Sequence, residues 1–277
     1  MEEVGMALYG GRPARELTLN DAIMTGFRMS IQVNFIVPIL VIGVIINAIV
    51  YAAFVPLLVN LVVGDSSGSE VIGGEVIAGI VGALVAGLIG GVLLNLYGQV
   101  WATMASVGTA PTIQEAFARV ALRWVAILGA GIIVAGVGLG FFIVGGILVA
   151  LLGGIGFVLF LVAIVASIYI GARLSLAGWL AADGAAAMDA VRKSWEITAS
   201  KVLMIIGWSI AAGIVFGIVG AILGTVLGII PLVGTPLATA IGTAFGFGSG
   251  VTIYRKVTAE VSAAAPGAPV PGAPSMG

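Results

Sequence analysis

Val125 to Ala172 reads VAILGAGIIVAGVGLGFFIVGGILVALLGGIGFVLFLVAIVASIYIGA, a run of 48 residues without a charged side chain. A transmembrane helix needs about 20 apolar residues to cross about 30 Å of hydrocarbon. The run is too long for one crossing and long enough for two, so it predicts two spans joined by a tight turn. Two glycine pairs suit that turn, Gly145-Gly146 and Gly153-Gly154, and the sequence does not choose between them.

Four more apolar stretches flank this run: Phe35 to Val63, Val76 to Val107, Val202 to Ile229 and Leu237 to Tyr254. The whole chain is 61% hydrophobic and 8% charged, with a mean hydropathy of +1.25, which lies outside the range of soluble domains. We therefore expect an all-α integral membrane protein. Its residues 18–262 should form six transmembrane helices arranged as three hairpins.

The basic residues test this division, because Lys and Arg accumulate in short cytoplasmic loops. All of them fall on one side of the predicted spans: Arg12, Arg15, Arg28, Arg119, Arg123, Arg173, Arg192, Lys193, Lys201, Arg255 and Lys256. The charged residues of the loop between the first two spans are all acidic. This pattern predicts a multi-pass protein of the cell membrane with both termini in the cytoplasm, namely a short segment 1–17 and a disordered tail 263–277 rich in Pro, Ala and Gly.

The composition also excludes several functions. The chain has no Cys and no His, which removes thiol nucleophiles, imidazole bases and the metal sites built from either. Its 11 basic and 12 acidic residues are nearly balanced, so no nucleic-acid partner is expected. The predicted spans contain no ionisable residue of the kind that couples transport to ions. We expect no catalytic residue, no metal, no cofactor and no enzymatic activity.

An acidic-Ala-apolar triplet precedes each predicted hairpin. The three triplets are Asp21-Ala22-Ile23, Glu115-Ala116-Phe117 and Asp189-Ala190-Val191. Thr18 and Thr112 stand three residues before the first two acids, which is the spacing of a helix capping box, and Asp183 or Gly184 is expected to start the third helix. The pattern predicts three repeats of a cytoplasmic interfacial amphipathic helix followed by a transmembrane hairpin, over about 18–107, 112–178 and 184–256.

The third of these helices carries the candidate site. Met188, Val191 and Trp195 share one face, and Arg192 and Lys193 lie on the opposite one. Such a helix should lie on the membrane with its apolar face down. Together with Arg173 at the end of the fourth span, the two cations either contact lipid headgroups or serve as anchors and ion-pair partners. For Arg173 the ion-pair candidates are Asp183, Asp189 and Glu196.

Two features within the spans predict helix packing. Asn47 and Asn95 lie at similar depths of the first hairpin, where an interhelical hydrogen bond is the first interpretation and a substrate site the second. Glycines at four-residue intervals predict close packing of the last two spans, with a contact between two copies of the chain as the alternative. They are Gly213 and Gly217, then Gly220, Gly224 and Gly228, in one span, and Gly242, Gly246 and Gly250 in the next.

Three short motifs resemble a known family: the stretch RLSLA at 173–177, the pair Asp183-Gly184, and AVRKSWEIT at 190–198. They are similar to the YciC-like proteins and to the membrane domain found beside some glycerophosphoryl diester phosphodiesterases. Asp183 stands where that family often has Glu, and Ala199-Ser200 where it often has Gly. The resemblance implies a membrane module, and it does not imply phosphodiesterase activity, because the catalytic barrel is not present.

These observations favour a non-enzymatic scaffold or accessory subunit. Its expected partners are membrane lipids, together with a second membrane protein or another copy of the chain. The alternative is a transporter or channel for a small neutral or lipidic molecule.

Overall fold

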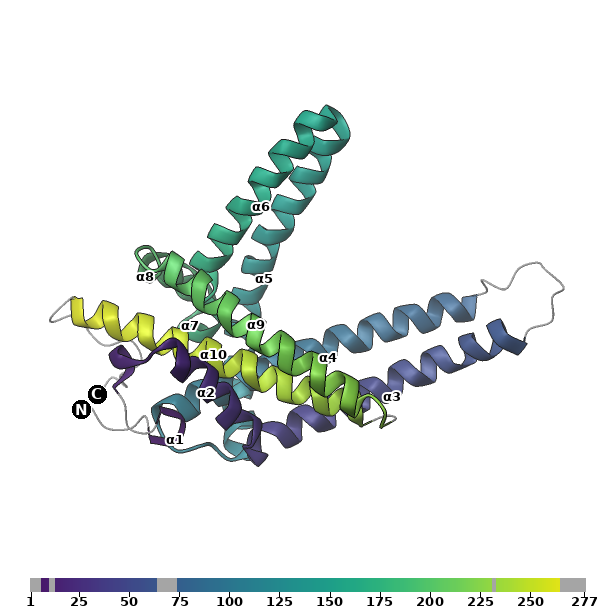
Figure 1. The fold of residues 1–277 in the computed structure, drawn as a ribbon, viewed down its shortest axis with the longest axis horizontal. Helices are drawn as coiled ribbons and strands as arrows, with labels where there is room; N and C mark the ends of the chain where they lie inside the picture. The colour runs from purple at the N-terminus through teal and green to yellow at the C-terminus, as the bar shows by residue number, and fades with distance from the viewer. Residues whose placement is uncertain (1–5, 10–12, 64–73, 231–232, 265–277) are drawn as a thin grey trace.

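The computed structural model describes residues 6–9, 13–63, 74–230 and 233–264 of the chain. Within this part the secondary structure is helical, and six helices are long and apolar enough to cross a membrane (Figure 1). They are α3 (Val33–Val63), α4 (Gly74–Val107), α5 (Ile113–Leu152), α6 (Gly154–Leu174), α9 (Val202–Leu227) and α10 (Gly234–Ala264). The predicted all-α fold with six apolar spans is confirmed.

The shorter elements lie before and between these spans. They are α1 (Met6–Tyr9), the 3₁₀ turn η1 (Ala14–Glu16), α2 (Leu19–Ser30), α7 (Ala177–Asp183) and α8 (Ala187–Ile197). The two predicted capping boxes are present: the backbone N–H of Thr18 donates to Asp21 and that of Thr112 donates to Glu115, both at 2.8 Å. These reciprocal bonds satisfy N–H groups that a helix start leaves without partners.

The prediction that Asp183 or Gly184 starts the third helix is wrong. Asp183 is the last residue of α7, and α8 begins at Ala187 without a side-chain cap. Gly184 follows with a φ of +134°, and its N–H bonds to the carbonyl oxygen of Leu180 at 3.1 Å. A glycine in this conformation ends a helix, because the left-handed region is strained for other residues.

The turn inside the long apolar run lies at Gly153-Gly154. Gly153 has a φ of +55° and its N–H bonds to the carbonyl oxygen of Val149 at 3.0 Å. The other candidate pair is inside α5, where a methyl group added to Gly145 would lie 2.4 Å from the Phe160 ring. Gly153-Gly154 therefore makes the turn, and Gly145 lets the Phe160 ring of α6 pack closely against α5.

Two boundaries differ from the sequence prediction. The predicted interfacial helix of the second repeat is not a separate element, because α5 runs without a break from Ile113 into the span. The last span was predicted to end at Tyr254, yet α10 continues to Ala264. Glu260 stabilises this extension by ion pairs with Lys256, four residues earlier, at 3.1 Å and with Lys201 at 2.5 Å. The rest of the predicted tail, the loop 64–73 and residues 1–5 and 10–12 lie outside the described residues.

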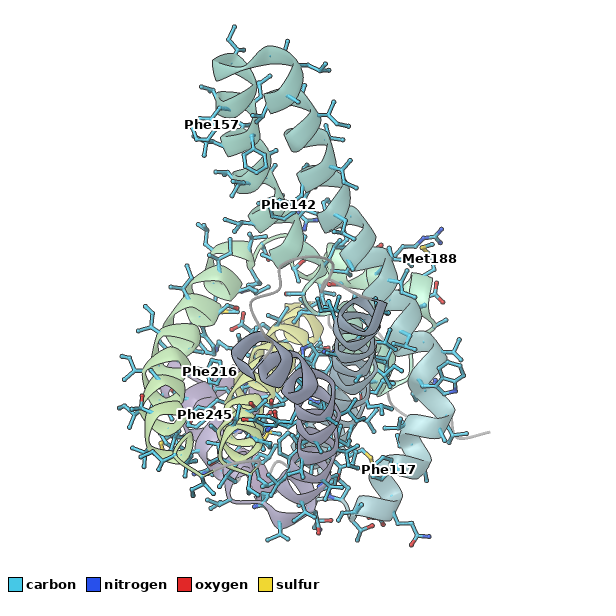
Figure 2. All side chains as sticks on the ribbon, turned by 90° about the vertical axis from the view of Figure 1, so that its right-hand side faces the viewer. Phe117, Phe142, Phe157, Met188, Phe216 and Phe245 are labelled. Atoms are coloured by element: carbon cyan, nitrogen blue, oxygen red, sulfur yellow. The ribbon has the colours of Figure 1, made fainter. Side chains whose placement is uncertain are left out.

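Helix α10 is the centre of the structure. Half of its apolar span is buried, compared with 6–17% in the other five spans, and it packs against α2, α3, α4 and α9. The α3–α4 and α5–α6 pairs each pack side by side and extend in different directions from this centre (Figure 1). Figure 2 shows side chains such as Phe142 and Phe157 on the free surface of the α5–α6 pair, a surface that suits lipid better than water.

The glycine faces of α9 and α10 pack less closely than predicted. Phe216 of α9 points toward α10 (Figure 2), and a methyl group added to Gly242 would lie 2.4 Å from its ring. A methyl group added to Gly217 or Gly246 would meet nothing within 4 Å. The prediction of close packing is thus wrong at Gly217 and Gly246, because the Phe216 side chain fills the contact and leaves space on either side of it.

Candidate functional site

The last turns of α6 and α8 are joined through the side chain of Arg173. Its Nε and Nη2 donate to the carbonyl oxygen of Trp195 at 3.1 and 2.6 Å, and its Nη1 donates to the Tyr169 hydroxyl at 3.0 Å. The last carbonyls of a helix have no partner within it and carry the negative end of its dipole. Arg173 therefore caps the C-terminus of α8 with a positive charge.

Two hydroxyls of the α8 segment make the opposite bonds. Ser194 Oγ donates to the carbonyl oxygen of Arg173 at 2.8 Å, and Thr198 Oγ1 shares its hydrogen between that oxygen at 3.0 Å and the carbonyl oxygen of Ser194 at 2.6 Å; both side chains are fully buried. That carbonyl belongs to the last turn of α6 and has no partner in its own helix. Each helix thus caps the end of the other. The Arg, Ser and Thr of the family-like motifs are the three residues in contact.

An apolar groove leads to this junction along α6. It has a volume of about 720 Å³, is lined from Val158 to Ile170 by α6 side chains, and ends at Trp195 of α8. At 1.5 Å per residue this is about 18 Å, close to the roughly 15 Å depth of one leaflet's hydrocarbon. The Trp195 ring centroid lies 4.2 Å from Arg173 Cζ, so the indole covers the guanidinium and leaves Arg173 only 9% exposed.

The two other predicted cations lie on the free side of α8. Arg192 is exposed and Lys193 is partly exposed, whereas the ion pairs found in the described part of the chain involve Lys201, Arg255 and Lys256. The helix buries Ala190, Ser194 and Ile197 and leaves Met188 and Trp195 exposed. The free surface of α8 therefore carries two basic side chains beside large apolar ones, together with the acidic side chains of Asp189 and Glu196.

A second polar cluster joins α4, α7 and α10. The Arg255 guanidinium lies 3.0 Å from Asp183 Oδ2 and donates from Nε to Ser106 Oγ at 2.8 Å, while the Tyr254 hydroxyl donates to Asp183 Oδ2 at 2.6 Å. Asp183, one of the partners considered for Arg173, is thus paired with Arg255. No signal in the sequence indicated this cluster, because Ser106 and Arg255 are 149 positions apart.

The two asparagines predicted to pair, Asn47 and Asn95, lie in α3 and α4. The Oδ1 of Asn95 accepts a hydrogen bond from Gln99 Nε2 on the same helix at 2.8 Å. Asn47 lies in the middle of α3. An interhelical bond between Asn47 and Asn95 stays a prediction.

Comparison with known proteins finds no relative of this chain. No protein-family model matches the chain, and no curated protein or solved structure is significantly similar to it. The chemistry of the α6–α8 junction is therefore the basis on which its function has to be inferred.

Proposed function

We propose that this protein is a non-enzymatic, multi-pass protein of the cell membrane that acts as a scaffold or accessory subunit and binds anionic phospholipid through α8. Both termini lie in the cytoplasm, and α8 lies along the inner surface of the membrane. The phosphate of the lipid contacts Arg192 and Lys193. One acyl chain lies in the α6 groove, past Trp195.

The observation that carries this proposal is that Trp195 belongs both to the helix that carries Arg192 and Lys193 and to the apolar groove. An anionic phospholipid needs a cationic surface at the headgroup level and an apolar surface below it, and the α6–α8 junction holds the two together. The reciprocal caps of Arg173, Ser194 and Thr198 fix that arrangement. Arg173 itself is assigned to this positioning role, since its guanidinium is covered by the indole.

We also propose that the resemblance to YciC-like membrane proteins reflects this junction. The similar motifs contain the residues that cap α6 and α8, so a protein that keeps these motifs would keep the junction.

The proposal predicts that lipid affinity depends on the two free cations. Each basic residue near an anionic surface contributes about 1 kcal/mol, so Arg192→Gln with Lys193→Gln should weaken binding of phosphatidylglycerol about 30-fold. The measurement is native mass spectrometry of the purified protein titrated with phosphatidylglycerol. The fold should persist, because neither side chain is buried.

Glu196→Gln is the matched control, because Glu196 is an exposed residue of the same helix and its replacement leaves both cations in place. It should bind phosphatidylglycerol at least as well as the unmodified protein. The proposal fails if the double variant keeps full affinity, or if the unmodified protein binds phosphatidylcholine as tightly as phosphatidylglycerol.

A further inference from the structure

A second cavity lies between α9 and α10 and shares no lining residue with the α6 groove. Its volume is about 710 Å³, within the range of small-molecule sites. Its lining follows α10 from Thr235 to Gly250, which is about 22 Å at 1.5 Å per residue. The cavity is thus longer than the about 15 Å of hydrocarbon that one leaflet supplies.

One end of the cavity is formed by Trp179 of α7, a tryptophan that is only 7% exposed. Its ring stacks on Tyr254 with centroids 6.4 Å apart and meets the edge of Phe247 at 5.9 Å. The ring edge that carries Nε1 faces Gly250, another lining residue. The indole N–H donates to no acceptor among the described residues, and its nitrogen is not one of the fully buried atoms. A donor that faces hydrocarbon without an acceptor costs free energy.

The polar groups of the cavity are uncharged. Thr235, Thr239 and Thr243 line its α10 wall at four-residue intervals. Within the described part of the chain no charged side chain lines the cavity, and Asp183 and Arg255, on the same two helices as Trp179 and the threonines, neutralise each other at 3.0 Å. A charged headgroup would therefore find no counter-ion here, whereas a carbonyl oxygen would find the Trp179 N–H.

We propose that this cavity binds a neutral membrane lipid, whose carbonyl oxygen accepts the Trp179 indole hydrogen bond and whose hydrocarbon chain lies along the α10 wall. A transmembrane helix of a second copy fits less well. Small residues favour helix association when backbones approach closely, and the Phe216 ring over Gly242 blocks that approach in the middle of the face. A flexible chain passes beside the ring.

The test uses a monoacylglycerol with a photoreactive diazirine in its acyl chain, added to the full-length protein in phosphatidylcholine nanodiscs. After irradiation, adducts are located by peptide mass spectrometry. We expect adducts on α9 and α10 close to the cavity. Gly246→Leu should abolish them, because its side chain enters the cavity from a position where an added carbon meets no neighbour.

Gly217→Leu is the matched control: a carbon added at Gly217 also meets nothing within 4 Å, but Gly217 does not line the cavity. It should keep the adducts. Trp179→Phe provides a second variant that keeps an aromatic ring and removes the donor, and it should lower the monoacylglycerol affinity about threefold to tenfold.

Three results would overturn the assignment: unchanged adducts in Gly246→Leu, equal loss in Gly217→Leu, or a protein dimer cross-linked through α10 in place of lipid adducts. Phosphatidylglycerol binding by Gly246→Leu, measured in parallel, separates this site from the α8 site. It should match the unmodified protein, because the two cavities are lined by different residues.

Discussion

Arg255→Gln should lower the free energy of unfolding by about 3–5 kcal/mol, because it leaves the Asp183 carboxylate in a mostly buried site without its cation. The side chains of Arg255 and Asp183 are only 13% and 18% exposed, so water replaces the lost partner poorly. The same change removes the bond from Arg255 Nε to Ser106 that ties α10 to α4. Unfolding in mixed detergent micelles measures this loss.

The double variant Asp183→Asn with Arg255→Gln shows whether the loss comes from an unpaired charge. It should recover part of the stability, since both charges are removed and no unpaired charge stays buried. Arg192→Gln removes an exposed arginine of α8 and should change the free energy of unfolding by less than about 0.5 kcal/mol. An equal loss in Arg255→Gln and Arg192→Gln would exclude the buried pair as the cause.

Arg173→Gln should cost about 2–4 kcal/mol, because it removes charge-assisted hydrogen bonds to the Trp195 carbonyl and leaves the end of α8 uncapped. Arg173→Lys should restore little of this, since an ammonium group cannot make the forked contact of a guanidinium. The same unfolding measurement applies to both variants.

Arg192→Gln is the control for Arg173, because it removes an arginine from the exposed side of the same junction and should change stability by less than about 0.5 kcal/mol. Ser194→Ala tests the opposite cap and should cost about 1 kcal/mol. If Arg173→Gln were as stable as Arg192→Gln, Arg173 would not hold α6 and α8 together.

The features that the sequence predicted well are those set by local chemistry. Bilayer thickness converts a long uncharged run such as 125–172 into a pair of spans, and the Thr18 and Thr112 capping boxes mark helix starts because their bonds reach only three residues. The sequence did not choose between the two glycine pairs, since the packing of Phe160 on Gly145 is a contact between two helices.

The features that were missed depend on contacts between distant segments. Arg173 was assigned to lipid or carboxylate partners, whereas its partner is a backbone carbonyl, which carries no signal in the sequence. The helix α7 went unrecognised because its seven residues are too few to show a helical period, although most of them are buried. Likewise, glycine spacing in α9 and α10 indicated small faces but not that Phe216 would cover one of them.

The lipid-binding role requires that α8 lies on the cytoplasmic side, and the absence of native Cys makes this simple to test with single introduced cysteines. Ser200, beside α8, and Leu152, at the turn between α5 and α6, are both exposed. With a membrane-impermeant maleimide, Leu152→Cys should react in intact cells, whereas Ser200→Cys should react only after the membrane is permeabilised. Labelling of Ser200→Cys in intact cells would place α8 on the outer surface and contradict the proposed function.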